Sequence, residues 1–293
     1  MILLLGSTGY VGEAFARFFK HSRIAFTTFS VRTLDDMDNL RDVLLREKIT
    51  YMFNCAGVTG KPNVDACEQI KDQTLLANSL LPAHLALTCA KYGVKFIHIS
   101  SGCIYDDSKC SNGHKPIKEF TEIDSPNFCF DSMRYSWYSA TKALREELIS
   151  SRVDRANYLC LRMRIPFNGE HNERNFISKL LSYPVLLNAT NSFSNLDEFV
   201  LNAFLLRNQI GVINLTQPGY ITTKQIVGYL QHYGLALDKQ FYKNCEDFDK
   251  VVNTPRSNCA LDSSYAIRCG AKLTPIADSF KSAIKAYIEQ PIK

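Results

Sequence analysis

Short apolar runs alternate with amphipathic stretches through the first half of the chain. We interpret the apolar runs as buried strands and the stretches of helical period as the helices between them. Strands alternating with helices form βαβ units with right-handed crossovers, which predicts a doubly wound, parallel α/β sheet of the Rossmann type. The strands are predicted at 2–5, 24–29, 51–54, 95–100 and 157–162, and the helices at 12–21, 37–47, 72–92 and 138–151.

The pattern changes after Arg164. Residues 166–175 are polar and loop-like, a short helix is predicted over 175–183, and 211–215 is predicted as a late strand of the sheet. The tail from residue 222 is mainly helical. We therefore predict a dinucleotide-binding domain over 1–165, to which a segment near 190–216 returns, and a smaller, mainly substrate-binding lobe over 166–293.

Composition excludes several classes of protein. The 293 residues are 46% hydrophobic and 22% charged, as in globular chains, and no apolar run approaches the ~20 residues of a membrane span. The net charge of +5 forms no Lys/Arg block, which suits an anionic small molecule better than nucleic acid or a membrane. The ten cysteines include no C-x-x-C pair and the start has no basic targeting region, so we expect reduced thiols in the cytoplasm. The six histidines lack metal-ligand spacing, so no metal site is expected.

A glycine-rich turn lies directly between the first predicted strand and the first predicted helix. It reads G-S-T-G-Y-V-G over residues 6–12. The first glycine allows the tight turn, the second lets a pyrophosphate approach the backbone, and the third lets the helix pack on the strand. The helix N-terminus offers its unpaired N–H groups to the phosphates. The predicted cofactor-binding residues are Gly6, Thr8, Gly9, Tyr10, Val11 and Gly12.

The end of the second strand distinguishes the two nicotinamide cofactors. An NAD site usually has an acid there to bind the ribose 2′-hydroxyl, but the segment Phe29–Arg32 contains none. The guanidinium of Arg32 suits a 2′-phosphate instead. We therefore expect NADPH, with NADH as the alternative.

The residues for hydride transfer form a second pattern. Tyr138 and Lys142 form Y-x-x-x-K on one face of a predicted helix. We expect the ammonium to lower the pKa of the phenol, so that Tyr138 acts as an acid toward a forming alkoxide and Lys142 also holds the nicotinamide ribose. A serine hydroxyl at the end of the fourth strand can stabilise the developing charge. Cys103 is expected to face the same way as Ser101 from an extended segment.

The spacing G-x-x-G-x-x-G resembles the short-chain dehydrogenase/reductase superfamily, particularly its extended members that act on nucleotide sugars. Over nearly its whole length the chain is also similar to the plant-type bifunctional UDP-4-keto-6-deoxyglucose 3,5-epimerase/4-reductases. It is more distantly similar to dTDP-4-keto-rhamnose reductases and GDP-fucose synthases. The motifs are N-C-A-G-V-T-G-K-P-N-V-D-A-C-E at 54–68, S-G-C-I-Y at 101–105, P-N-F at 126–128, Y-S-A-T-K at 138–142, R-N-F-I-S-K at 174–179 and R-S-N at 256–258.

The resemblance implies roles for individual residues. It favours Ser101 over Ser100 as the catalytic serine, and it implies that Cys103 and Lys179 are the epimerisation pair. The end of the third strand lines the adenosine side of the cofactor in the superfamily, which points to Asn54, Ala56 and Gly57. We expect Asn175 and Arg256 to bind the nucleoside diphosphate of the substrate, since Arg suits bidentate phosphate contacts.

The expected function is the NADPH-dependent conversion of UDP-4-keto-6-deoxy-D-glucose to UDP-L-rhamnose. A 4-keto group acidifies the hydrogens at C3 and C5, and two groups on opposite faces of the ring can invert both centres. One alternative is a 4-ketoreductase alone, which does not need Cys103 and Lys179. Another is a non-catalytic NADP-binding regulatory subunit, which does not need the Ser-Tyr-Lys set. UDP or dTDP as the carrier, the acid and base of the epimerisation pair, and a homodimeric state stay open.

Overall fold

The computed structural model describes residues 1–235 and 238–290 and contains a parallel sheet of six strands. The four residues of β1, Ile2–Leu5, are all buried, because helices cover both faces of this interior strand. The sheet order is β11-β6-β4-β3-β1-β2. The other strands are β2 (Phe26–Phe29), β3 (Tyr51–Asn54), β4 (Lys95–Ser101), β6 (Tyr158–Met163) and β11 (Gly211–Asn214).

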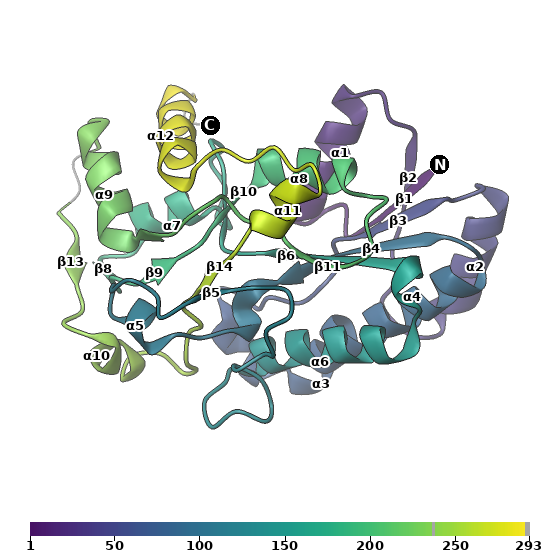
Figure 1. Cartoon of the computed structure of the whole chain (residues 1–293), viewed down its shortest axis with the longest axis horizontal. Helices are drawn as coiled ribbons and strands as arrows, with labels where there is room; N and C mark the ends of the chain where they lie inside the picture. Colours follow the sequence, from purple (N-terminus) through teal and green to yellow (C-terminus); the bar gives the residue numbers. More distant parts are fainter. Residues whose placement is uncertain (236–237, 291–293) are drawn as a thin grey trace.

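Helices lie on both faces of this sheet (Figure 1). Successive side chains of a strand point to opposite faces, so Leu4 packs into one apolar cluster and Leu5 into the other. The cluster around Leu4 includes α1 (Tyr10–His21), α8 (Leu196–Leu205) and α11 (Ser264–Arg268). The cluster around Leu5 includes α2 (Asp36–Arg46), α4 (Leu81–Lys91) and α6 (Trp137–Arg152).

The strand order confirms the predicted doubly wound fold. The strands β2 and β3 pair with opposite edges of β1, so the order of the sheet reverses there. Ligands of such sheets bind outside the carboxyl ends of the strands at this reversal. The predicted helix at 72–92 is interrupted, because a π-helical turn over Leu76–Leu80 separates α3 (Lys71–Leu75) from α4. Such turns often occur at functional sites.

The C-terminal part packs around a third apolar cluster. The Phe167 and Phe280 rings stack there with centroids 3.9 Å apart. As predicted, β11 returns to the sheet, whereas the division into two domains at residue 165 stays our proposal. The helices are α5 (Ser108–Ser111), α7 (Phe176–Ser182), α9 (Thr223–His232), α10 (Cys245–Asp249) and α12 (Ile276–Glu289). The two-residue strands are β5 (Glu119–Phe120), β7 (Pro166–Phe167), β8 (Val185–Leu186), β9 (Thr190–Asn191), β10 (Ser194–Asn195), β12 (Ile221–Thr222), β13 (Gln240–Phe241) and β14 (Ala260–Leu261).

Three further observations concern the general properties of the chain. Among residues 1–235 and 238–290, no helix has the length and apolar character that crossing a membrane requires. Within the same ranges, no group of three His, Cys, Asp or Glu side chains is arranged to hold a metal ion. All ten cysteines lie in the described part of the chain and carry free thiols.

A buried ionic cluster joins β4, β6 and α6. The carboxylate of Glu146 accepts hydrogen bonds from Arg162 Nη2 at 2.7 Å and Nε at 3.0 Å, and from the Ser100 hydroxyl. Ser100 Oγ in turn accepts from Arg145 Nη2 at 2.6 Å. Burial alone would raise the pKa of Glu146, but the charge and hydrogen bonds of Arg162 outweigh it and the pKa is lowered. This cluster fixes the start of the segment that carries the candidate catalytic side chains.

We predict that Glu146→Gln lowers the free energy of unfolding by about 3 kcal/mol, because it leaves two buried guanidinium groups without their counter-charge. Urea denaturation at neutral pH measures this change. The folded-state pKa of Glu146 lies below the unfolded value of about 4.3. Its stabilisation is therefore complete above that pH and is lost as the pH falls through the folded pKa.

The matched control is Glu147→Gln on the exposed face of the same helix, which we expect to change the free energy of unfolding by less than about 0.5 kcal/mol. Equal stabilities of the two variants would contradict the role given to the buried cluster.

Candidate active site

The glycine-rich turn has the geometry of a phosphate cradle. Gly6 has a φ of 71°, and a Cβ added to Gly12 would lie 2.0 Å from the Gly6 carbonyl oxygen, so both positions require glycine. The helix α1 begins after Gly9 with no side-chain cap, and Thr8 and Gly9 are exposed. The first N–H groups of α1 are therefore available to an anion.

Tyr10 connects this turn to the C-terminal half of the chain. Its hydroxyl donates to Asn168 Oδ1 at 2.9 Å, and the same oxygen accepts from Asn175 Nδ2 at 3.2 Å. Asn175 is fully buried and caps α7 by accepting from the Ile177 N–H at 3.1 Å. The Asn175 side chain thus positions α7, the helix that carries Lys179. Contact between Asn175 and a substrate stays a prediction.

The loop after β3 contacts the Y-x-x-x-K helix through one asparagine. Asn78, from the π-helical turn, bonds both the N–H and the carbonyl of Val58 at 2.9 Å. Asn78 Oδ1 also accepts from Lys142 Nζ at 3.1 Å. A Cβ on Gly57 would lie 3.0 Å from both Asn78 Oδ1 and Lys142 Nζ. The backbone predicted to line the cofactor therefore lies directly beside Lys142.

The beginning of the same loop is held by a buried side chain. Asn54 Oδ1 accepts from the Ala56 N–H at 3.0 Å, and Asn54 Nδ2 lies 3.1 Å from His98 Nδ1. Both Asn54 and His98 are buried. Asn54 thereby shapes the turn at Ala56, and its contact with a cofactor stays a prediction.

The two serines at the end of β4 have different surroundings. The Ser100 hydroxyl is bonded within the ionic cluster, whereas Ser101 Oγ accepts from the Cys103 N–H at 3.2 Å. This geometry favours Ser101 for the chemistry. The expectation of an extended segment is wrong, because β4 ends at Ser101 and the chain turns in a 3₁₀-helix over Gly102–Ile104. The turn nonetheless keeps Cys103 beside Ser101.

The start of α6 positions Tyr138. The Glu68 carboxylate accepts from the Trp137 N–H at 2.8 Å, and Ser136 caps the helix by accepting from the Ser139 N–H. Burial raises the pKa of Tyr138, a negative charge on Cys103 raises it further, and the hydrogen bond with Ser101 lowers it. The predicted lowering of the phenol pKa is therefore wrong for this structure, because burial dominates.

Burial also shifts the pKa of Lys142, the second residue of the Y-x-x-x-K pattern. Lys142 is 6% exposed, and burial together with the charge of Arg145 lowers its pKa well below the ordinary value. A negative charge on Cys103 raises the pKa of Lys142 again. Lys142 Nζ lies 5.4 Å from the centroid of the Tyr138 ring, and Cys103 lies beside Ser101 at the end of β4.

Lys179 lines a hollow whose lining residues do not include Cys103, Tyr138 or Lys142, so its meeting with them at one substrate stays a prediction. The hollow has a volume of about 660 Å³, and Lys61, Pro62 and Arg174 also line it. Burial lowers the pKa of Lys179, and the charge of Arg174 lowers it further. Arg174 donates to the Thr59 hydroxyl at 2.8 Å, which holds this hollow against the loop that carries Gly57.

Two predicted arginines differ in their surroundings. Both terminal nitrogens of Arg256 bind the Asp65 carboxylate, at 2.6 and 3.0 Å, so an ion pair already uses its guanidinium. Phosphate binding by Arg256 stays a prediction. Arg32 is exposed beyond β2, and its backbone N–H donates to Asp36 at 2.7 Å. The Arg32 side chain therefore lies at the surface, and its contact with a 2′-phosphate stays a prediction.

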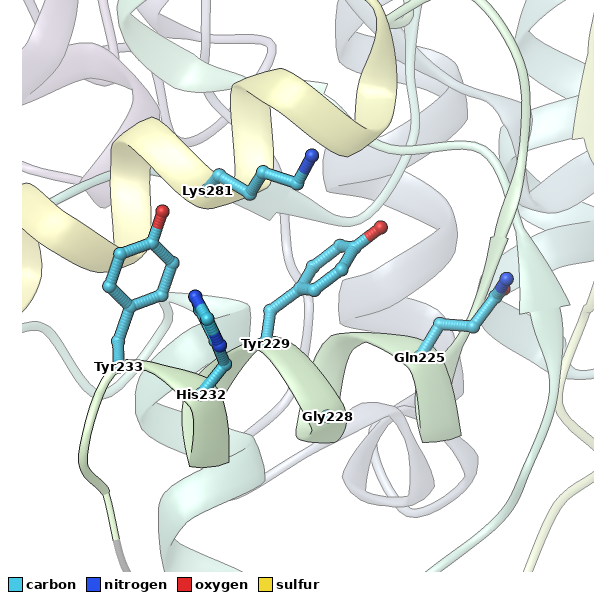
Figure 2. A pocket seen from close by; sticks show the side chains of 6 residues that line it. All are labelled: Gln225, Gly228, Tyr229, His232, Tyr233 and Lys281. Atoms are coloured by element: carbon cyan, nitrogen blue, oxygen red, sulfur yellow. The ribbon is translucent and has the colours of Figure 1, made fainter.

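A second hollow lies between α9 and α12 (Figure 2). Its volume is about 640 Å³, and its side chains include Tyr229, Tyr233, His232 and Lys281. The ammonium of Lys281 lies 5.6 Å from the centroid of the Tyr229 ring. None of the predicted site residues lines this hollow, so it is not part of the candidate active site.

The sequence analysis missed two buried arginines of the site. Arg164 Nη1 donates to Cys103 Sγ at 2.9 Å, and Arg145 is fully buried one turn after Lys142. The signal for Arg164 was R-x-R at the end of a predicted strand, because two charges on one face of a buried strand need partners. The signal for Arg145 was its spacing, since 138, 142 and 145 share one helix face.

The fold defines a dinucleotide-binding α/β protein of the Rossmann type, and Ser101, Tyr138 and Lys142 are its candidate catalytic residues. Residues 1–185 match the family described as the RmlD substrate binding domain, and the chain belongs to that family. A bifunctional dTDP-4-dehydrorhamnose 3,5-epimerase/dTDP-4-dehydrorhamnose reductase of Arabidopsis thaliana is 34% identical over 271 residues, which are 89% of this chain and 85% of the relative.

A longer relative and two solved structures are also similar to this chain. A trifunctional UDP-glucose 4,6-dehydratase/UDP-4-keto-6-deoxy-D-glucose 3,5-epimerase/UDP-4-keto-L-rhamnose-reductase of Arabidopsis thaliana is 34% identical over 94% of this chain, which spans only 40% of that relative. A UDP-rhamnose synthase of Acanthamoeba polyphaga mimivirus has a TM-score of 0.88 at 24% identity, over 97% of this chain and 98% of that chain. A dTDP-4-dehydrorhamnose reductase of Bacillus anthracis, in complex with NADP, has a TM-score of 0.78 at 14% identity, over 98% of both chains. At these identities the two structures support the fold.

We predict that Asn78→Ala loosens the loop after β3, because the N–H and the carbonyl of Val58 both lose their partner. The free energy of unfolding should fall by about 1–3 kcal/mol. Hydrogen exchange at the Val58 amide, followed by mass spectrometry, should become faster. The control Asn39→Ala, on the exposed face of α2, should leave that amide unchanged. Unaltered exchange at Val58 in the Asn78 variant would contradict this role.

Proposed function

We propose that this protein is a bifunctional nucleotide-sugar 3,5-epimerase/4-ketoreductase that uses NADPH to convert UDP-4-keto-6-deoxy-D-glucose to UDP-L-rhamnose. The observation that carries the proposal is the placement of Ser101 and Cys103 where β4 ends, with Tyr138 and Lys142 near the start of α6, where Lys142 Nζ lies 5.4 Å from the centroid of the Tyr138 ring. A reductase alone needs the first three. The names of the relatives support both activities.

The residues of the turn fit a dinucleotide. The uncapped start of α1 offers N–H groups to the pyrophosphate, and Gly12 leaves no space for any side chain against the Gly6 carbonyl. Arg32 lies exposed beyond β2, where it can bind a 2′-phosphate, and NADH is the alternative cofactor. When bound, the cofactor supplies the hydride that reduces the sugar ketone.

Epimerisation uses Cys103 and Lys179 in this proposal. Removal of the proton at C3 or C5 of the 4-keto sugar leaves an enolate, whose oxygen the hydroxyls of Ser101 and Tyr138 can stabilise. Inversion requires a proton donor on the face opposite the base. Cys103 lies in the turn after β4 and Lys179 on α7, and we propose that the two approach the sugar ring from opposite faces.

Reduction uses Tyr138 and Lys142. As hydride reaches C4, negative charge develops on the ketone oxygen, and the Tyr138 hydroxyl donates a proton to it while Ser101 donates a hydrogen bond. The raised pKa of Tyr138 keeps the phenol protonated before hydride transfer, although it also makes the phenol a weaker acid. Lys142, fixed by Asn78 beside Gly57, is placed to hold the nicotinamide ribose.

A 4-ketoreductase alone is the alternative function. The contact between Arg164 and Cys103 disfavours it, since reduction does not require a thiol paired with a buried cation. A regulatory subunit that binds NADP without chemistry is disfavoured by the presence of Ser101, Tyr138 and Lys142 together, since binding alone does not need this set.

We predict that the purified protein with NADPH and UDP-4-keto-6-deoxy-D-glucose forms UDP-L-rhamnose, identified by NMR, and that the dTDP-linked substrate run in parallel reports the preferred carrier. Tyr138→Phe should lower the rate of NADPH oxidation by a factor of about 10²–10⁴. Tyr135→Phe is the matched control, because Tyr135 is more exposed and has no lysine four residues later. Equal rates for the two variants would contradict the role of Tyr138.

Cys103→Ala separates the two activities. This variant should produce no rhamnose from the 4-keto-6-deoxyglucose nucleotide but should still reduce a 4-keto-rhamnose nucleotide within a few-fold of the wild-type rate. Full rhamnose production by the variant would contradict the epimerase proposal and would leave the reductase alone.

We predict that Arg32→Ala lowers the preference for NADPH over NADH by about tenfold, because the charge on the 2′-phosphate loses its partner. The ratio of kcat/KM for the two cofactors measures this preference. Arg46→Ala, an exposed arginine at the end of α2, is the control that should leave the ratio unchanged. An unchanged ratio in the Arg32 variant would show that other residues select the cofactor.

A further inference from the structure

We propose that Arg164 is a positioning residue that holds the Cys103 sulfur in its charged form and makes Cys103 the proton acceptor in epimerisation. The role of Cys103 in catalysis rests on the proposed function above. The contact between the Arg164 guanidinium and the Cys103 sulfur does not rest on the proposed function, and the alkylation that tests it needs no substrate.

The first support is the geometry of the pair. Arg164 Nη1 lies 2.9 Å from Cys103 Sγ and donates to it. Nη2 of the same guanidinium is held by Asn191 Oδ1 at 2.6 Å and by the Ser257 carbonyl at 2.5 Å. The Arg164 N–H also donates to Ser194 Oγ. These contacts fix the direction in which Nη1 points, which is toward the sulfur.

The second support is the balance of charge around Arg164. The side chain is 1% exposed, and its hydrogen-bonded neighbours Asn191 and Ser257 contribute neutral oxygens. Its Nε has no hydrogen-bond partner in the described part of the chain. The Asp106 carboxylate, which is paired with Arg134, and the thiols of Cys259 and Cys103 are the ionisable groups whose charge acts on Arg164. Of these groups, only Cys103 is hydrogen-bonded to the guanidinium. A buried guanidinium favours negative charge at the ionisable atom that it contacts. That atom is the sulfur of Cys103, which is only half-buried and can therefore meet a ligand.

The chemistry follows from this placement. A charged sulfur takes a proton from C3 or C5, the S–H bond forms, and the electron pair of the broken C–H bond moves into the enolate on the 4-oxygen. A proton carried by Lys179 then bonds to the same carbon from the opposite face. The thiol finally returns its proton to water, and the Lys179 amine takes one from water. No oxidant or reductant takes part in these steps.

The experiment measures alkylation of Cys103 by iodoacetamide in the full chain without substrate, with the modified peptide quantified by mass spectrometry. Cys103→Ser identifies that peptide. We expect Arg164→Met to slow the alkylation of Cys103 by at least about tenfold, because the thiolate is the reactive form. In Arg164→Lys, which keeps the positive charge but not the planar guanidinium, the alkylation rate of Cys103 should lie between those of the wild type and Arg164→Met. Cys129, also half-buried but not in contact with an arginine, is the internal reference and should not change.

Reduction of a 4-keto-rhamnose nucleotide is the test of folding. A variant that keeps this reaction within a few-fold of wild type is correctly assembled, so slower alkylation of Cys103 in it supports the proposal. Unchanged alkylation of Cys103 in such a variant overturns it. If Arg164→Met loses the reduction, Arg164→Lys decides by the same criterion.

The two proposals fail separately. If alkylation of Cys103 is slow in the Arg164 variants but the wild-type protein forms no rhamnose, the proposed Arg164–Cys103 interaction stands and the proposed epimerase activity is rejected. Normal rhamnose formation by a variant with unchanged alkylation would reject only the role of Arg164. A structural role alone would lower all rates together, and it would not single out Cys103 over Cys129.

Discussion

The carboxylate of Glu146 lies in the interior where β4, β6 and α6 meet, and the arrangement of the site depends on it. It carries the negative charge that makes burial of the Arg162 guanidinium tolerable, and it lies 3.8 Å from Arg145. The Ser100 hydroxyl completes the cluster. Because these groups belong to three different elements, they fix the carboxyl end of β4 against the helix that carries the candidate acid. One residue beyond Ser100 the chain reaches Ser101, where the proposed chemistry begins.

The second constraint is the set of polar contacts that join distant segments around this end of the sheet. Tyr10 reaches α7 through Asn168 and Asn175, and the segment 63–68 reaches both Arg256 and the start of α6. Through these contacts the phosphate cradle, the cofactor-lining loop and the helix with Lys179 are held in one frame. The polar residues of the N-V-D-A-C-E motif therefore act structurally. Asp65 binds the Arg256 side chain, and Glu68 binds the backbone N–H at the start of α6.

The architecture could be predicted from the sequence because each strand is a short apolar run bounded by polar turns. The glycine spacing at 6–12 and the Y-x-x-x-K pair could be placed because each depends on local geometry. The partner of Asn78 could not be predicted, since its hydrogen bonds go to Val58, which lies 20 residues earlier in the chain. The direction in which the Tyr138 pKa shifts could not be predicted either, because burial decides it and the neighbouring lysine does not. Arg164 was visible as a charge at the end of a strand, but its partner emerges only when the chain folds.

The central claim is that a thiol, a phenol and an amine act on the same sugar ring, and isotope incorporation tests it most directly. The reaction would be run in D₂O from the 4-keto-6-deoxyglucose nucleotide with unlabelled NADPH, and the rhamnose product would be examined by NMR. We predict deuterium at both C3 and C5 and protium at C4, because solvent protons pass through Cys103 and Lys179 whereas C4 receives hydride. A rhamnose product that retains protium at C3 and C5 would contradict the account.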